Sequence, residues 1–230
     1  MNKIWYLKRC DLFHGLNNEA MERIAAVANE KNVPKKQVVM SADAENGVMY
    51  ILKKGTVRVF KLSPDGKMIT LDILKDGDIF GAMSAIKGGT AGAYAETLDD
   101  SYICAIRQEA LTGIIKEMPD LAISLIGKIN QKLKDAEERI ADLVFRDVPG
   151  RIASVLLKLA EQFGKSGDSG VEISIKLTHQ ELADMVGASR ETATIVLNEF
   201  KEDKVVSISE KHISIIDEKR LRQWAGKDLT

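Results

Sequence analysis

Hydrophobic and polar residues change their spacing twice along the chain, which divides it into three regions. Between about residues 33 and 106, short apolar runs are separated by turn residues such as Lys54-Gly55 and Ser63-Pro64-Asp65-Gly66, a pattern typical of antiparallel strands. The expected strands span residues 38–40, 47–52, 55–62, 68–74 and 102–106. This region predicts a β-roll or barrel, preceded by a short amphipathic helix over residues 18–30.

After Pro119 the apolar positions follow a heptad spacing, which predicts one long helix over residues 119–146. The heptad positions are Ala122, Ile126, Ile129, Leu133, Ala136, Ile140 and Leu143. Such a row usually packs against a partner helix, so we expect a dimer seam made of Ile126, Ile129, Leu133, Ala136 and Ile140. Packing of the same row on the β-domain of its own chain is the alternative.

A break at Asp147-Val148-Pro149 ends this helix and begins the next, because Asp147 is placed to cap and Pro149 suits a first turn. We expect a hinge here. The third region then predicts a helix over residues 151–163, a linker over 164–170 and a strand over 171–175. Two later strands, 205–209 and 212–216, flank Glu210-Lys211 and predict the hairpin wing of a winged helix.

Residues 178–197 contain two short helical patterns around a glycine turn, which predicts a helix-turn-helix. Thr178 is placed to cap the first helix with Glu181 reaching back, and Ser189 is placed to cap the second. The positions expected to face inward are Leu182, Val186, Ala193, Val196 and Leu197.

The second of these helices is expected to expose Arg190, Glu191 and Thr194 beside the cap Ser189. An arginine can donate to a guanine edge and a glutamate can accept from cytosine, so this helix start suits the major groove of DNA. The candidate DNA-contact residues are Thr178, His179, Gln180, Ser189, Arg190, Glu191, Thr192, Thr194, Ile195 and Asn198. An ordinary helical hairpin with a solvated face is the alternative.

Composition describes a soluble globular protein of 230 residues, with 45% hydrophobic and 29% charged residues. The N-terminal sequence lacks the apolar core of a secretory signal and no run approaches membrane-spanning length, so a cytoplasmic protein without a membrane partner is expected. Residues 149–230 carry 12 Lys and Arg against 13 Asp and Glu. Any positive face toward DNA must therefore come from uneven placement of these charges.

Enzymatic chemistry is not indicated, because the sequence shows no nucleophile–base pattern, no metal-ligand spacing among its three histidines and no Walker-type phosphate loop. Two cysteines, Cys10 and Cys104, cannot supply a disulfide scaffold or a four-cysteine metal site. A regulatory binding module whose helices contact another protein remains a different class of function. The exposed Arg190-Glu191 pair favours DNA over that class.

Several short motifs follow one another in order along the chain: Gly55-x-Val57-x-Val59, Asp65-Gly66, Gly77-Asp78-x-Phe80-Gly81, Asp147-Val148-Pro149-Gly150-Arg151 and Gly187-x-Ser189-Arg190-Glu191-Thr192. With these motifs the sequence resembles the Crp/Fnr family of bacterial transcription regulators. The resemblance implies an α+β fold: a cyclic-nucleotide-binding-like antiparallel β-roll over residues 1–118, a dimerisation helix over 119–146 and a winged helix-turn-helix over 147–230. It also implies a homodimer that binds palindromic half-sites in double-stranded DNA and contacts RNA polymerase.

The sequence departs from the cyclic-AMP-binding members of that family around its effector loop. Those members carry a glutamate after the glycine that matches Gly81 and then an arginine followed by a serine, whereas this chain has Ala82 and no arginine in residues 88–93. Ala136-Glu137 also stands where they place hydroxyl residues. A buried phosphate without a charged partner is poorly compensated, so the effector is not expected to be cyclic AMP.

The remaining loop is small and mostly apolar, which suits a flat or hydrophobic ligand such as haem, or simply a filled core. The candidate effector-pocket residues are Gly81, Ala82, Met83, Ser84, Ala91, Gly92 and Ala93. His14, Cys10, Cys104 or a methionine would be the axial ligand of a haem. A redox switch at Cys10, which lies beside Lys8 and Arg9, and a regulator that needs no effector are also compatible with the sequence, so the cofactor stays unknown.

At Ile195 the cyclic-AMP regulators have an arginine, one helical turn beyond Glu191. An isoleucine cannot donate to guanine, although it can pack against a thymine methyl group. The resemblance therefore implies a half-site related to the TGTGA type with a changed preference at one base.

Overall fold

The computed structural model describes residues 8, 10–13, 16–42, 47–81, 92–167 and 170–226. Its contacts divide the chain into two units, residues 1–133 and 134–230, and the boundary falls inside helix α5 (Pro119–Phe145). The separate dimerisation segment over residues 119–146 stays a prediction, as do the other two domain ranges.

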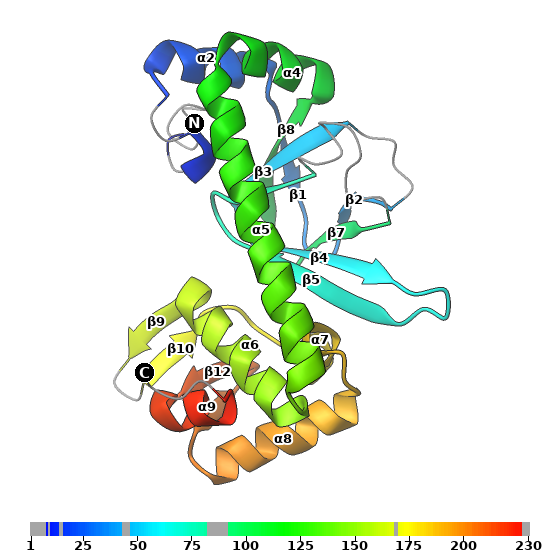
Figure 1. The fold of residues 1–230 in the computed structure, drawn as a ribbon, viewed down its shortest axis with the longest axis vertical. Helices are drawn as coiled ribbons and strands as arrows, with labels where there is room; N and C mark the ends of the chain where they lie inside the picture. Colours follow the sequence, from blue (N-terminus) through cyan, green and yellow to red (C-terminus); the bar gives the residue numbers. More distant parts are fainter. Residues whose placement is uncertain are drawn as a thin grey trace. The chain divides into compact units, whose positions relative to one another are not determined.

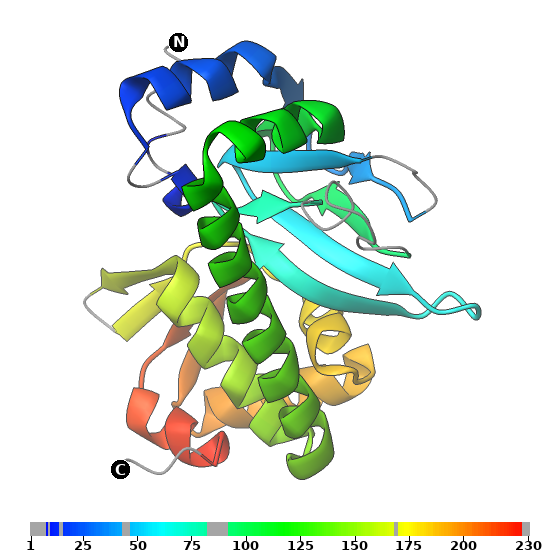
Figure 2. The ribbon, with the colours of Figure 1, turned by 45° about the horizontal axis from the view of Figure 1, so that its top comes forward.

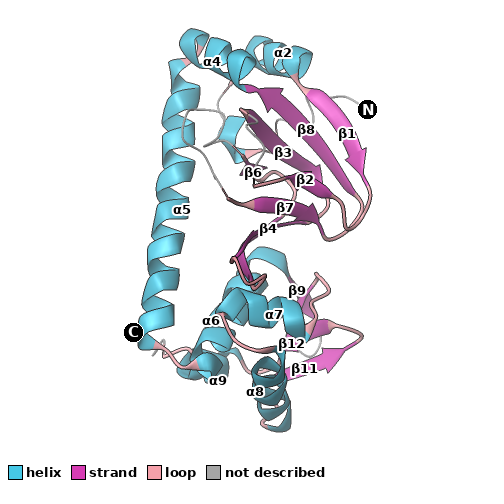
Figure 3. Ribbon diagram, turned by 90° about the vertical axis from the view of Figure 1, so that its right-hand side faces the viewer, coloured by secondary structure: helices cyan, strands magenta, loops and turns pink. Residues whose placement is uncertain are grey.

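Two antiparallel four-stranded sheets form the roll of the N-terminal unit (Figures 1 and 3). In one sheet the strand order is β1 (Asn29–Val33), β8 (Ser101–Arg107), β3 (Val48–Lys54) and β6 (Ile79–Phe80). In the other it is β2 (Val38–Met40), β7 (Tyr94–Thr97), β4 (Val57–Leu62) and β5 (Met68–Leu74). Strands β4 and β5 form a long hairpin, visible in Figure 2. In its turn the Gly66 N–H donates a hydrogen bond to the Ser63 carbonyl at 2.9 Å.

Apolar side chains from both sheets meet inside the roll. This core contains Val33, Met40, Leu52, Val57, Val59, Leu74, Phe80, Ala93, Ala95 and Ile103. Burying one aliphatic side chain of this size stabilises a fold by about 1.5–3 kcal/mol, so the set holds the two sheets together. Because successive strand residues point to opposite faces, Val57 and Val59 share the inner face of β4.

Three helical segments close one end of the roll: the short turn η1 (Asp11–Phe13), α2 (Asn18–Val27) and α4 (Gln108–Glu117). Phe13, Ile24 and Leu111 are at most 1% exposed and belong to one apolar cluster with strands β3 and β8. The first turns of α5 join the same cluster through Leu121 and Leu125.

The C-terminal unit is built around α6 (Val148–Phe163), whose buried face includes Ile152, Leu156 and Leu159. Asp147 caps α6 by accepting a hydrogen bond from the Gly150 N–H at 2.9 Å, as the sequence predicts. A sheet in the order β11 (Val206–Ser209), β12 (His212–Ile215), β10 (Gly170–Ile173) and β9 (Gly164–Gly167) accompanies it. The remaining helices are α7 (His179–Val186), α8 (Arg190–Glu202) and α9 (Glu218–Trp224).

The predicted fold class is confirmed: an antiparallel roll, a long helix and a winged helix-turn-helix follow one another along the chain. Strands β2 and β5 have the predicted bounds, and the predicted wing is the β11–β12 hairpin. None of the helices within the described ranges is both long enough and apolar enough to cross a membrane.

Two predicted segments are wrong. The helix expected over residues 18–30 ends at Val27, because Ala28 is extended and residues 29–33 pair with β8. Residues 164–167, expected in a linker, form β9 and pair with β10. In both cases backbone pairing with a neighbouring strand decides the structure, and side-chain patterning does not report it.

Candidate DNA-binding interface

Helix α7 begins at a complete capping box. The Thr178 hydroxyl accepts a hydrogen bond from the Glu181 N–H at 3.2 Å, and the Glu181 carboxylate accepts one from the Thr178 N–H at 2.7 Å. Two backbone donors at the helix start are thereby satisfied, and the predicted cap is confirmed.

The turn between α7 and α8 depends on Gly187, which has φ 65° and ψ 43°. This left-handed conformation is strained for residues with a Cβ atom, so glycine suits the end of α7. Two residues later Ser189 caps α8, accepting a hydrogen bond from the Thr192 N–H at 3.1 Å. Only three residues, 187–189, therefore separate the last residue of α7 from the first residue of α8.

One face of each helix is buried in the unit. The residues predicted to face inward, Leu182, Val186, Ala193, Val196 and Leu197, are all at most 4% exposed. This packing holds α8 by its apolar side and leaves the opposite side to solvent.

The solvent side of α8 carries the predicted reading residues. Arg190, Glu191 and Asn198 are exposed, and Ile195 is 67% exposed. A hydrogen bond from its own backbone N–H holds the pKa of Glu191 below its usual range, and the Ser189 side chain lowers it further. Glu191 is therefore ionised at neutral pH and is available as a hydrogen-bond acceptor.

Thr194 links the two helices. His179 Nδ1 lies 2.8 Å from the Thr194 hydroxyl oxygen, and that hydroxyl donates to the Arg190 carbonyl at 2.8 Å. Because a hydroxyl has one hydrogen, this pattern assigns the Nδ1 proton to His179. The His179 ring thus fixes the first residue of α7 against the first turns of α8, while Thr192 and Thr194 are half-buried.

The tip of the wing hairpin lies beside the start of α7. Its two-residue turn, Glu210-Lys211, has φ values of 48° and 72°, and the Lys211 carbonyl accepts a hydrogen bond from the Leu177 N–H at 2.9 Å. Leu177 directly precedes the α7 cap, so the wing tip lies at the start of the helix-turn-helix. The structure brings the predicted residues of α7 and α8 together, and their contacts with DNA stay a prediction.

The predicted effector pocket is described only in part, because Ala82, Met83, Ser84 and Ala91 lie outside the described residues, as does His14. Gly81 has φ 70°, and a Cβ atom there would lie 2.5 Å from the Val48 carbonyl oxygen, so the position accepts only glycine. Ala93 is 1% exposed and belongs to the core between the sheets. Gly92 donates its N–H to the Ala42 carbonyl at 3.4 Å.

Neither Cys10 nor Cys104 forms a disulfide, and each is 1% exposed. Among the residues that the structure describes, no group of three or more His, Cys, Asp and Glu side chains is placed to hold a metal ion. Haem ligation and a redox switch at Cys10 stay untested hypotheses.

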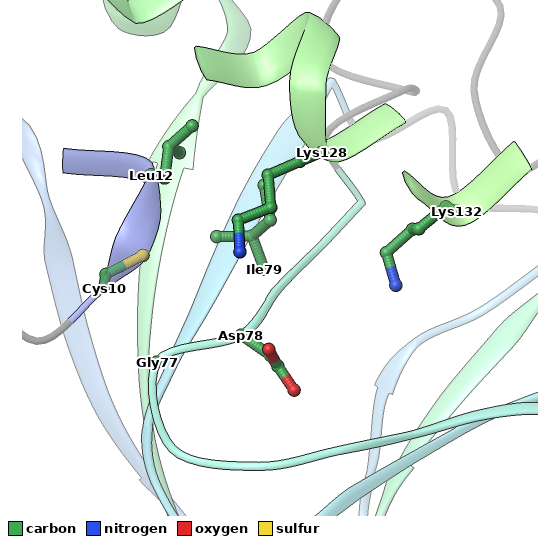
Figure 4. Close-up of a pocket in the computed structure, with 7 residues that line it drawn as sticks. All are labelled: Cys10, Leu12, Gly77, Asp78, Ile79, Lys128 and Lys132. Atoms are coloured by element: carbon green, nitrogen blue, oxygen red, sulfur yellow. The ribbon is translucent and has the colours of Figure 1, made fainter. Parts of the chain in front are cut away.

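A pocket on the N-terminal unit has Cys10 and Leu12 on one side and Lys128 and Lys132 of α5 on the other (Figure 4). The segment Gly77-Asp78-Ile79 lies between them. Lys132 also forms an ion pair with Asp72 at 2.6 Å. The lining mixes charged and apolar groups and differs from the small, apolar lining predicted for residues 81–93.

Comparisons with known proteins match both units. Residues 30–118 match a cyclic nucleotide-binding domain, and residues 150–224 match a Crp-like helix-turn-helix domain. A CRP-like cAMP-activated global transcriptional regulator of Mycobacterium tuberculosis is 29% identical over 219 residues, which are 95% of this chain and 98% of the relative. A cAMP-activated global transcriptional regulator CRP of Pasteurella multocida is 30% identical over 184 residues, which are 79% of this chain and 87% of the relative.

The same architecture occurs among solved structures. A mutant of CooA from Carboxydothermus hydrogenoformans superimposes with a TM-score of 0.74 and 25% sequence identity. The match covers 87% of this chain and 88% of that chain.

Asp78 in the pocket predicts a pH dependence of stability. Burial raises its pKa above the ordinary value of 3.8, and a hydrogen bond from the Lys75 N–H at 2.9 Å offsets part of the effect. The folded protein therefore keeps this proton to higher pH than the unfolded chain does, and stability falls as pH rises from about 3.8 through the folded pKa. Asp78→Asn should remove this fall, measured as the free energy of unfolding in urea from pH 4 to 8. Parallel curves for both proteins would contradict the assignment.

Proposed function

The chain belongs to the Crp/Fnr family of bacterial transcription regulators, and on this premise we propose that it binds palindromic operator DNA as a homodimer. In this proposal α8 reads the bases, α5 joins two copies, and an effector other than cyclic AMP controls binding. The proposal also includes a contact between the DNA-bound dimer and RNA polymerase, which is typical of the family. The observation that carries the proposal is the exposed Ser189-Arg190-Glu191 start of a capped helix whose opposite face is buried.

Base readout is assigned to Arg190 and Glu191. An arginine forms two parallel hydrogen bonds with guanine, and an ionised glutamate accepts one from cytosine. Ile195 offers an apolar contact to a thymine methyl group, because its side chain is 67% exposed on the same helix. Thr178, His179, Gln180, Ser189 and Thr192 flank these residues at the two helix starts, where backbone and side-chain donors suit phosphate oxygens.

Arg190→Ala is expected to weaken binding to the operator by about 1–3 kcal/mol and to weaken binding to unrelated DNA much less. The matched control is Lys201→Ala, which removes an exposed positive charge from the far end of the same helix. Fluorescence anisotropy at fixed salt, with operator and with unrelated DNA, measures the ratio of the two affinities. An equal loss on both DNAs would reduce Arg190 to a phosphate contact.

Dimerisation is assigned to the seam of α5. Ile126, Leu133 and Ile140 are 57%, 57% and 61% exposed in the single chain. Ala136 is exposed as well, and Ile129 is half-buried. Scattered exposed apolar residues are ordinary on protein surfaces. A continuous apolar row at heptad spacing favours packing against a helix of a second copy, and not against the β-roll of the same chain.

Leu133→Lys is expected to give a monomer with greatly reduced operator affinity, because it places two unpaired charges opposite each other in the seam. The control is Gln131→Lys, which adds the same charge at an exposed position outside the heptad row. Sedimentation velocity over a dilution series gives the association state. A Leu133→Lys protein that remains dimeric at low concentration would place the interface elsewhere.

The effector proposal rests on the loop sequence. The relatives from Mycobacterium tuberculosis and Pasteurella multocida are described as cAMP-activated. The resemblance to the cyclic-AMP-binding members of the family implies a glutamate and an arginine in this loop. This chain has Ala82 after Gly81 and no arginine in residues 88–93. Cyclic AMP then lacks the carboxylate and guanidinium contacts through which it would favour one dimer arrangement over another.

Cyclic AMP is therefore expected neither to bind at micromolar concentration nor to change operator affinity. Isothermal titration calorimetry and operator binding with and without the nucleotide test both points. Micromolar binding together with stimulated operator affinity would show that backbone donors of the loop suffice. An absorption spectrum and a mass spectrum of the purified protein then identify the effector class, since haem gives a Soret band and a retained ligand gives a mass.

A further inference from the structure

The last turns of α5 are part of the DNA-binding unit, since the boundary between the units falls after Leu133. Polar contacts join these turns to α6 and α7: Asp135 with Lys158 at 3.2 Å, Asp142 with Ser154 at 2.8 Å and Arg139 with the Met185 carbonyl at 2.6 Å. The helix that carries the seam thus reaches the helix-turn-helix directly.

The contact made by Arg139 falls at the C-terminal end of α7. The last carbonyls of a helix have no partner within the helix, and the helix dipole makes this end negative. Arg139 Nη2 donates to the Met185 carbonyl, and Arg151 Nε donates to the next one, that of Val186, at 3.0 Å. Two guanidinium groups therefore bind consecutive carbonyls immediately before Gly187.

Arg151 is held in place by a second bond. Its Nη1 donates to the Arg146 carbonyl at 2.9 Å, and Arg146 in turn pairs with Asp142 at 2.6 Å. The side chain of Leu143 also packs against this turn. A Cβ atom added to Gly187 would lie 3.7 Å from Leu143 Cδ2, which is ordinary van der Waals contact. The end of α5 and the start of α6 thus support the α7–α8 turn from one side.

We propose that Arg139 is a positioning residue for the reading helix: by holding the C-terminal end of α7, it sets the direction of α8. Only the turn residues Gly187, Ala188 and Ser189 separate the bound carbonyls from the first residue of α8. A change in the position of Met185 and Val186 is therefore passed to Arg190 without an intervening loop to absorb it. The proposal rests on the proposed DNA-reading role of α8.

Sequence patterning does not reveal this role. Arg139 lies between Ala136 and Ile140 on a helix rich in charged residues, where a solvated surface residue is the ordinary expectation. Its hydrogen bond joins residues 46 positions apart in the chain, and only the folded unit shows it.

The test compares Arg139→Ala with Arg222→Ala, which removes the same side chain from α9, where it pairs within the helix with Glu218. Arg139→Ala is expected to lose about tenfold in operator affinity, the effect of one hydrogen bond to a charged group, with less than a twofold loss on unrelated DNA. The dimer should persist in sedimentation velocity. Hydrogen exchange should become faster in the peptide that contains Gly187 and Ser189 but not in α6. Arg139→Lys, which keeps the charge and one donor, should recover part of the affinity.

Three results would overturn the proposal: no change in operator affinity, an equal loss on both DNAs that Arg222→Ala reproduces, or faster exchange throughout the unit with a matching fall in unfolding midpoint. The last would give Arg139 a stabilising role only. Arg190→Ala in the same assay tests the reading role of α8 separately from the positioning role of Arg139. If Arg190→Ala leaves the ratio of operator to unrelated DNA unchanged, the reading role of α8 fails, whereas a selective loss for Arg190→Ala alone removes only the role of Arg139.

Discussion

The surface proposed to read DNA, the exposed residues at the start of α8, depends on the three-residue turn between α7 and α8. Gly187 adopts a left-handed conformation that ends one helix, and Ser189 caps the next two residues later. The buried faces of both helices and the guanidinium groups of Arg139 and Arg151 hold this turn in place. The direction in which Arg190 and Glu191 point thus follows from backbone geometry, and their side chains are proposed to supply the contacts with the bases.

The C-terminal unit was the more predictable half, because its signals are local. The Thr178–Glu181 capping box, the Ser189 cap and the inward residues of both helices were all predicted and are confirmed. The class of protein, a transcription regulator and not an enzyme, is also confirmed by the relatives. Strand β1 and the hairpin strand β9 were not predicted, since their polar residues owe their conformation to backbone pairing with distant or unpatterned neighbours.

The two predicted sites depend on different kinds of information. The residues proposed to read DNA lie mostly on one capped helix, so their spacing in the sequence fixes how they lie relative to one another. The effector site would be assembled from the loop after Gly81 and from α5, and the pocket around Asp78 shows how tertiary packing brings together residues as far apart as Cys10 and Lys132. Spacing in the sequence does not predict such a tertiary contact, whereas the lack of an arginine in residues 88–93 can be read directly from the sequence.

The wing tip has a consequence for how this region varies among related chains. Glu210 and Lys211 both hold left-handed conformations without being glycine, and they close a hairpin whose strands pair Val206 with Ile215. Both of these residues are buried. Adding one residue to a strand reverses which face each side chain takes, so a longer strand would turn one of them to water. Among related chains, the sequence of the wing hairpin should therefore vary by substitution, with glycine and asparagine readily accepted at the two turn positions. The number of residues in the hairpin should remain constant.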